Sequence, residues 1–232
     1  MGNLLMASVV FLGIHLLIAG TRIRSALVGA MGEKVYTALF SLASIGGIVW
    51  LAMAYNAAVV SEDNVVYWSA PIGLLHAGSL IILIAFLFAV IGLTTPNPTA
   101  AMADDLAKQP DVVKGILRIT RHPFLWGVFI WSAFHMAANG DRASATFFGT
   151  FAILSLLGTF SIDSKRRAKL GDDWDAFEKA TSNIPFAAIL TGRARLKIGE
   201  IGWWRIGLAI LVWAGFLYIH PWLFGVSPFP AR

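Results

Sequence analysis

The sequence of 232 residues contains no cysteine. This absence excludes disulfide bonds, thiolate nucleophiles, cysteine-ligated zinc and iron–sulfur clusters. Charge is also scarce, because only 13% of the residues are Asp, Glu, Lys or Arg, whereas soluble domains usually carry about 25%. Hydrophobic residues make up 57% of the chain, and its mean hydropathy is +0.71. The composition therefore predicts a protein of the lipid bilayer.

Long apolar runs divide the chain into predicted membrane helices, each of which needs about 20 residues, or about 17 at the short limit. The six segments are 3–20, 36–60, 70–93, 123–138, 143–161 and 203–224, of which the fourth falls below that limit. The first has no preceding basic residues and no small-residue cleavage site, so we expect a retained helix rather than a signal peptide. We expect an all-α integral membrane bundle of about six transmembrane helices, forming a single domain over 1–232.

The distribution of basic residues predicts an orientation. Fifteen of the eighteen Lys and Arg residues lie in the loops 21–35, 94–122 and 162–202. The loops 61–69 and 139–142 between them contain only Arg142. Since cytoplasmic loops are enriched in Lys and Arg, we expect the three basic loops inside and both termini outside a bacterial-type inner membrane. The lipid bilayer thus accounts for the net charge of +5, and we expect no nucleic-acid partner.

Two of the connecting segments have interpretable patterns. The 162–202 stretch predicts a basic amphipathic helix on the inner membrane surface, with its charges facing water. Its apolar residues Trp174, Phe177 and Ile184 would then face lipid or protein. The short run Asn139-Gly140-Asp141 is typical of a tight turn between two helices, and we assign it no chemistry.

Two histidines, His15 and His135, lie deep within apolar segments that contain no acidic residue. Polar groups at such depth are costly and usually functional, and neutral imidazole is a common ligand of metals and haem iron. At about 1.5 Å per residue, each lies roughly 18 Å from the face where its helix begins, so in a core of about 30 Å their levels differ by roughly 6 Å. Such a pair could clamp one planar metal macrocycle, for which haem is the natural candidate. The alternative is that each neutral histidine bonds a carbonyl of a neighbouring helix.

The other histidines are closer to the predicted interfaces. His76, near the outer end of the third segment, could contact the same site or lie at the membrane surface. His122 is expected to be partly hydrated beside Arg121, with a role in helix capping, headgroup contact or anion recognition. Other chemistries have less support, since no acid accompanies a histidine within the spans and the sequence has no zinc-binding helix or glycine-rich phosphate loop.

Several runs resemble a known family. One comprises Thr120-Arg121-His122-Pro123, Gly127, Trp131, His135 and Asn139-Gly140, and a later one comprises Gly171, Trp174, Phe177, Lys179, Thr181, the stretch 184–189 and Gly192-Arg193. Two shorter runs are 11–15 and 32–36. Together they resemble the NnrU family, which includes the zeta-carotene isomerase of plants and cyanobacteria, and the resemblance covers most of the chain.

The resemblance implies a redox-gated integral membrane haem b protein. Ferric iron would be held by two histidines, one of which leaves on reduction so that the iron can act on a cis double bond of a polyene. The later ligand follows the arginine–histidine–proline histidine by thirteen residues, which is the spacing from His122 to His135. The earlier ligand corresponds to His15.

The predicted site therefore has His15 and His135 as catalytic and metal-binding residues, with further cofactor contacts expected from His76, His122 and Arg121. Arg121 and Arg193 are our candidates for pairing with the haem propionates. We also expect an apolar small-molecule substrate and an electron donor, which the sequence does not identify.

Two alternatives remain open at this point. Arg121-His122-Pro123 with Asp163 also resembles isoprenylcysteine carboxyl methyltransferases, in which this motif and two adjacent acids contact S-adenosylmethionine. Here Asp163-Ser164 takes the place of the acid pair, and Phe124 and Leu125 replace the usual tyrosine region. The third reading is a non-catalytic accessory protein in denitrification or nitrogen-oxide metabolism.

Overall fold

The computed structural model describes residues 1–101, 103–109 and 111–229, and within these ranges the chain is helical and contains no strand. The predicted apolar segments correspond to α1 with its continuation η1 (Gly2–Leu12 and Gly13–Ile18), α3 (Glu33–Val59), α4 (Ile72–Thr94), α5 (Pro123–Asn139), α6 (Arg142–Leu170) and α9 (Trp203–Phe224). The shorter elements are α2 (Arg22–Met31), η2 (Asp104–Lys108), η3 (Gly115–Arg118), α7 (Asp172–Ala180), α8 (Ala187–Leu190) and η4 (Ile198–Glu200). The prediction of an all-helical protein is confirmed.

Four of the described helices, α3, α4, α6 and α9, are long and apolar enough to cross a membrane. The number rises to five if the segment Gly2–Ile18 and α2, which meet at 79°, form one broken span. Helix α5 has only 17 residues, so the predicted number of about six spans is higher than these criteria give. Large apolar side chains remain exposed along these helices, as at Leu42 and Met53 of α3 and Leu211 of α9. Faces of this kind are suited to lipid.

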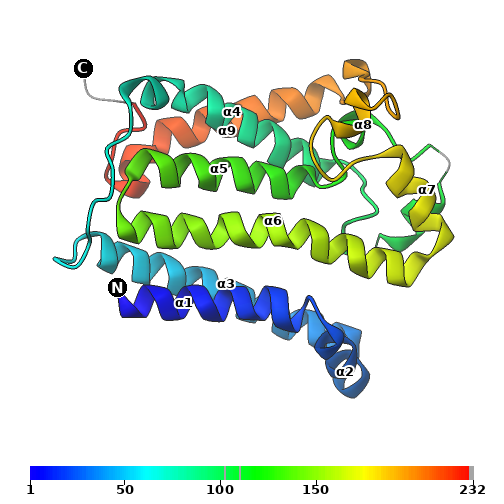
Figure 1. Ribbon diagram of the computed structural model, residues 1–232, viewed down its shortest axis with the longest axis horizontal. Coiled ribbons are helices and arrows are strands. Elements are labelled where there is room, and N and C mark those ends of the chain that lie inside the picture. The colour runs from blue at the N-terminus through cyan, green and yellow to red at the C-terminus, as the bar shows by residue number, and fades with distance from the viewer. Residues whose placement is uncertain (102, 110, 230–232) are drawn as a thin grey trace. The chain divides into compact units, whose positions relative to one another are not determined.

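The chain packs as two compact units, and α5 and α6 contribute to both. Unit 1 consists of residues 1–71 and 132–161. Its first helix α1 lies beside α3 (Figure 1). The predicted turn at 139–141 is present here, because α5 ends at Asn139, Gly140 has a φ of 71° and α6 begins at Arg142. The Asp141 carboxylate accepts a hydrogen bond from the backbone N–H of Ser144 and so caps α6.

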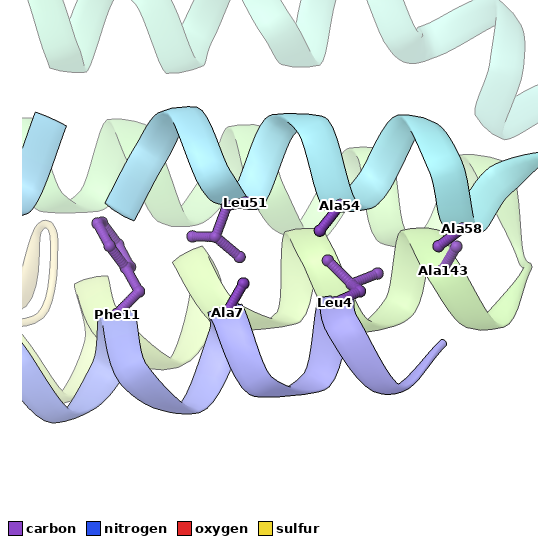
Figure 2. Close-up of a cluster of buried hydrophobic side chains, with 7 residues drawn as sticks. All are labelled: Leu4, Ala7, Phe11, Leu51, Ala54, Ala58 and Ala143. Atoms are coloured by element: carbon purple, nitrogen blue, oxygen red, sulfur yellow. The ribbon is translucent and has the colours of Figure 1, made fainter. Parts of the chain in front are cut away.

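Small residues form much of the core of unit 1. Figure 2 shows Leu4, Ala7 and Phe11 of α1 pointing toward Leu51, Ala54 and Ala58 of α3, with Ala143 of α6 in the same cluster. Small side chains let membrane helices approach closely. Gly47 illustrates this, because a Cβ atom there would lie 2.8 Å from the Phe11 ring. The glycine of α3 is therefore what leaves room for an aromatic ring of α1.

Unit 2 consists of residues 72–131 and 162–232, of which the structure describes all but 102, 110 and 230–232. Helices α4 and α9 lie side by side within it (Figure 1). Phe86 and Phe216 are in contact between them, with ring centroids 5.4 Å apart, and the Trp213 indole donates to the Ser79 carbonyl. A second core joins Phe88 of α4 to the loop that precedes α5.

The surface helix predicted over 162–202 is wrong as a single element. Helix α6 continues to Leu170, and the separate elements α7, α8 and η4 follow. Trp174 and Phe177 pack on Leu117 and are almost fully buried, so protein rather than lipid covers the apolar face of α7. Ile184 is exposed. The prediction of one domain over 1–232 stays a prediction.

Candidate functional site

His15 lies on η1, a π-helical turn that continues α1. In this turn the backbone N–H of Ala19 bonds to the carbonyl of Ile14, five residues earlier, whereas an α-helix bonds four residues back. Such turns occur often at functional sites. The Nδ1 atom of His15 lies 2.8 Å from the Phe11 carbonyl oxygen. Because a carbonyl only accepts hydrogen bonds, Nδ1 carries the proton and donates it.

The other ring nitrogen of His15 faces Ser44 of α3. Nε2 lies 3.3 Å from the Ser44 hydroxyl oxygen, which is also 2.8 Å from the Phe40 carbonyl. A hydroxyl has one proton to donate, and the Phe40 carbonyl is the closer acceptor. Because Nδ1 carries the proton, Nε2 is the ring nitrogen with the lone pair, and the Ser44 hydroxyl is its polar neighbour.

Aromatic rings connect His15 to His135 within unit 1. From the His15 imidazole, contacts lead through Phe11, at 4.4 Å between centroids, to Phe151, at a further 5.7 Å. They continue along α6 through Phe147 and Phe148, and Phe148 stacks on the His135 imidazole at 4.9 Å with an interplanar angle of 24°. Both predicted ligands thus lie in one compact unit, and four phenylalanine rings stand between their imidazoles along this path.

The residues around His15 suit a haem held through its imidazole. Metal-bound histidines usually donate their other N–H to a carbonyl or carboxylate, which fixes the tautomer and the ring orientation, and His15 makes such a bond to Phe11. The rings around His15 and His135 are apolar, as a porphyrin face requires. Among the described residues, no three His, Asp or Glu side chains converge as a site for a bare metal ion.

A second polar centre lies in unit 2, around Asp163 near the polar end of α6. Its carboxylate accepts two hydrogen bonds from Arg121, at 2.9 and 2.5 Å, and one from Nε2 of His122 at 2.7 Å. Asn183 donates a longer one at 3.3 Å, and Arg121 also pairs with Glu178. The side chains of Arg121 and Asp163 are 7% and 8% exposed, so this is a buried ion pair whose charges compensate one another.

His122 was expected to be partly hydrated at an interface, and this expectation is wrong. The residue is only 2% exposed, because its imidazole is enclosed beside Asp163 rather than facing headgroups. Burial lowers the pKa of the His122 imidazole, although its bond to Asp163 opposes this. The imidazole is therefore neutral at pH 7, and Nε2 donates to the carboxylate. Its Nδ1 atom is buried and has no hydrogen-bond partner within the described residues.

The remaining predicted contacts are also in unit 2. His76 is exposed on α4, with Nδ1 bonded to the Ile72 carbonyl. Arg193 lines a cavity of about 380 Å³ and donates to the carbonyls of Lys179 and Thr181. His15 and His135 thus belong to one unit, whereas His76, His122 and Arg121 belong to the other.

The family model described as NnrU protein matches residues 3–228. The chain belongs to the NnrU family. No solved structure is significantly similar to it.

Two relatives of this NnrU-family chain are proteins described as 15-cis-zeta-carotene isomerase, chloroplastic. The one from Zea mays is 27% identical over 198 residues, which cover 83% of this chain and 52% of the maize protein. The one from Arabidopsis thaliana is 37% identical over 79 residues, which cover 34% of this chain and 22% of that protein. The chain therefore spans about half the length of the maize relative or less than a quarter of the Arabidopsis one in these matches.

Sequence reasoning missed several polar partners in this NnrU-family chain. Ser44 lies in an apolar span and carries no motif, so only its position opposite His15 reveals it. Glu178 and Asn183 follow α6 in a segment rich in polar residues, where many side chains are equally plausible partners. Tyr36 was noted within the 32–36 run, but nothing in the sequence indicates that its hydroxyl is buried without a partner.

Proposed function

We propose that this NnrU-family chain is a membrane haem b protein that isomerises a cis double bond in an apolar, carotenoid-like polyene. The similarity to two proteins described as 15-cis-zeta-carotene isomerase supports the class of reaction and substrate. The long apolar helices and their exposed apolar faces support a membrane location. A substrate of this kind dissolves in the bilayer and would enter the bundle from lipid.

The observation that carries the proposal is the state of His15. Its Nδ1–H is held by the Phe11 carbonyl, so Nε2, which lies 3.3 Å from the Ser44 hydroxyl, is the ring atom that would bind iron. His15 and His135 would hold the iron of this haem. When bound, haem b would supply a redox-active iron that can offer an open position to a double bond.

The phenylalanines around His15 and His135 orient and enclose the two imidazoles. Phe11 orients the His15 imidazole through its carbonyl and contacts it through its ring. Phe148 and Phe134 enclose the His135 imidazole, with centroids 4.9 and 5.5 Å away. Apolar walls of this kind exclude water and accommodate a hydrocarbon chain, while the few polar groups fix the position of the cofactor.

Absorption spectra test the proposal directly. We expect protein purified in detergent from haem-supplied cells to show a Soret band that shifts on reduction with dithionite. His15→Ala and His135→Ala should each abolish or shift the band, because each removes an imidazole that would hold the iron. His220→Ala, which removes a partly exposed histidine of α9, is the matched control and should leave it unchanged. A colourless wild-type protein, or unchanged spectra in both ligand variants, would contradict the proposal.

The methyltransferase alternative gains no support from the site geometry. Arg121 would contact the cofactor in such an enzyme, but its guanidinium is bonded to Asp163 and Glu178. We therefore do not propose it as a second function.

A further inference from the structure

A tyrosine close to His15 has a hydroxyl group without a hydrogen-bond partner. Tyr36 lies in the first turns of α3 and is 7% exposed. Its hydroxyl oxygen is fully enclosed and bonds to no side chain or backbone group among the described residues. A buried donor in this state destabilises the protein unless something else accepts its proton. The position therefore indicates a missing acceptor.

The surroundings of Tyr36 favour an acidic acceptor. The Arg24 guanidinium carbon lies 5.3 Å from the centroid of the Tyr36 ring. Arg24 is on α2, is partly exposed and pairs with Glu33. A phenol hydroxyl and a guanidinium together offer one neutral and one charged donor. Carboxylate oxygens are well suited to both, because charge-assisted hydrogen bonds are the stronger kind.

Ring contacts connect this pair to His15. Tyr36 stacks on Phe40 with centroids 5.9 Å apart and an interplanar angle of 19°. Phe40 in turn contacts the edge of the His15 imidazole at 5.3 Å. A single phenylalanine thus separates the unsatisfied hydroxyl from the candidate iron ligand, and all four residues belong to unit 1.

We propose that the Tyr36 hydroxyl, assisted by Arg24, binds a propionate carboxylate of the haem held by His15. This inference rests on the proposed function, because it needs the haem to be there. It gives the cofactor an acid-binding group in the same unit as His15 and His135. Arg121 and Arg193, the candidates from the sequence, belong to the other unit.

The test compares haem b with its dimethyl ester, in which both carboxylates are blocked. Haem-free protein in detergent is titrated with each pigment, and Kd is measured from the Soret band. Tyr36→Phe should weaken the binding of haem b about tenfold, which is the value of one hydrogen bond to a charged group. The ester carries no charge and accepts weakly, so its Kd should rise no more than about threefold. Arg24→Gln should show the same difference between the two pigments.

Tyr55→Phe is the matched control. Tyr55 also lies on α3, but its hydroxyl is bonded to Ser144 at 2.9 Å. In the haem-free protein, Tyr55→Phe should lower the Tm because it leaves Ser144 without that partner. Tyr36→Phe should leave the Tm unchanged or raise it, since it removes an unsatisfied group.

Two kinds of failure can be told apart. If wild-type protein gives no Soret band with either pigment, the proposed function fails and this inference fails with it. If haem b binds but Tyr36→Phe weakens the binding of both pigments equally, or of neither, only the inference is overturned. A drop in Tm for haem-free Tyr36→Phe as large as that of Tyr55→Phe would also overturn it, because the hydroxyl would then have a protein partner.

Discussion

At the scale of single residues, Asp163 holds a buried and densely bonded polar centre of unit 2. Its carboxylate is 8% exposed and accepts hydrogen bonds from Arg121, His122 and Asn183. The network ties the loop before α5 to the end of α6 and to the segment after α7. It is a structural junction first, because its donors come from two separate parts of the chain, the loop before α5 and the segment after α7.

Replacing Asp163 by alanine should strongly destabilise the protein. The substitution leaves the Arg121 guanidinium buried with only Glu178 beside it, and breaking a buried ion pair costs about 3–5 kcal/mol. Thermal unfolding in detergent measures the effect. Asp105→Ala is the control, since the Asp105 side chain is 94% exposed and its pair with Lys108 contributes little. Equal Tm values for the two variants would contradict the assignment of Asp163 as a buried junction.

Glu200, which lies outside the predicted spans, makes the stability of the protein depend on pH. Hydrogen bonds from Arg118 lower the pKa of Glu200 from 4.5 to about 2, although partial burial opposes this. The folded state then binds fewer protons than the unfolded state between these pH values, so this stabilisation is complete above pH 4.5 and is lost as pH falls toward 2. We expect the Tm of the wild type to fall more steeply over this interval than that of Glu200→Gln. Parallel curves would show that the carboxylate is not held in this way.

At the scale of helices, the contact between α1 and α3 depends on one glycine. A methyl group at Gly47 would lie 2.8 Å from the ring of Phe11, the residue that also orients His15. At the neighbouring Gly46, nothing lies within 4 Å of such a methyl group. Of the two adjacent glycines of α3, only Gly46 therefore has room for a larger side chain.

Gly47→Ala should separate α1 from α3 and lower stability by about 1–3 kcal/mol, the usual cost of overpacking. Gly46→Ala should be neutral or slightly stabilising, because alanine favours the helix and meets no neighbour. Thermal unfolding of the two variants in detergent distinguishes the positions. The contact as described is wrong if the two substitutions have the same effect.

The sequence predicted the locations of the helices far better than the tertiary contacts of their side chains. Long apolar runs exceed what a strand can contain, so the locations of α3, α4, α6 and α9 followed directly from composition. An apolar helix face, however, does not reveal what covers it, and Trp174 was for that reason assigned to lipid or protein without distinction. His122 appeared hydrated because its partner Asp163 lies 41 residues away in the sequence, and only the methyltransferase resemblance brought the two together. Such pairing is set by tertiary packing, which a local pattern does not encode.

At the scale of the whole molecule, the distribution of basic residues predicts the orientation in the membrane. The three basic loops are expected on the cytoplasmic side and the loop 61–69 on the other. The absence of cysteine makes this easy to measure, because any introduced cysteine is the sole thiol of the chain. In intact cells, a membrane-impermeant maleimide should label Glu62→Cys and leave Asp172→Cys unlabelled. After lysis both should react, since both side chains are exposed. The reverse pattern would invert the proposed topology.

The π-helical turn at Gly13–Ile18 has a consequence for how this part of the chain can change. Such a turn accommodates about one residue more than an α-helical turn, so an in-frame deletion of a single codon within it would restore a regular helix. Because the turn absorbs this additional residue locally, everything beyond the deletion would keep its register and its facing along the helix. The segment can thus lose one codon without changing the direction in which α2 leaves it.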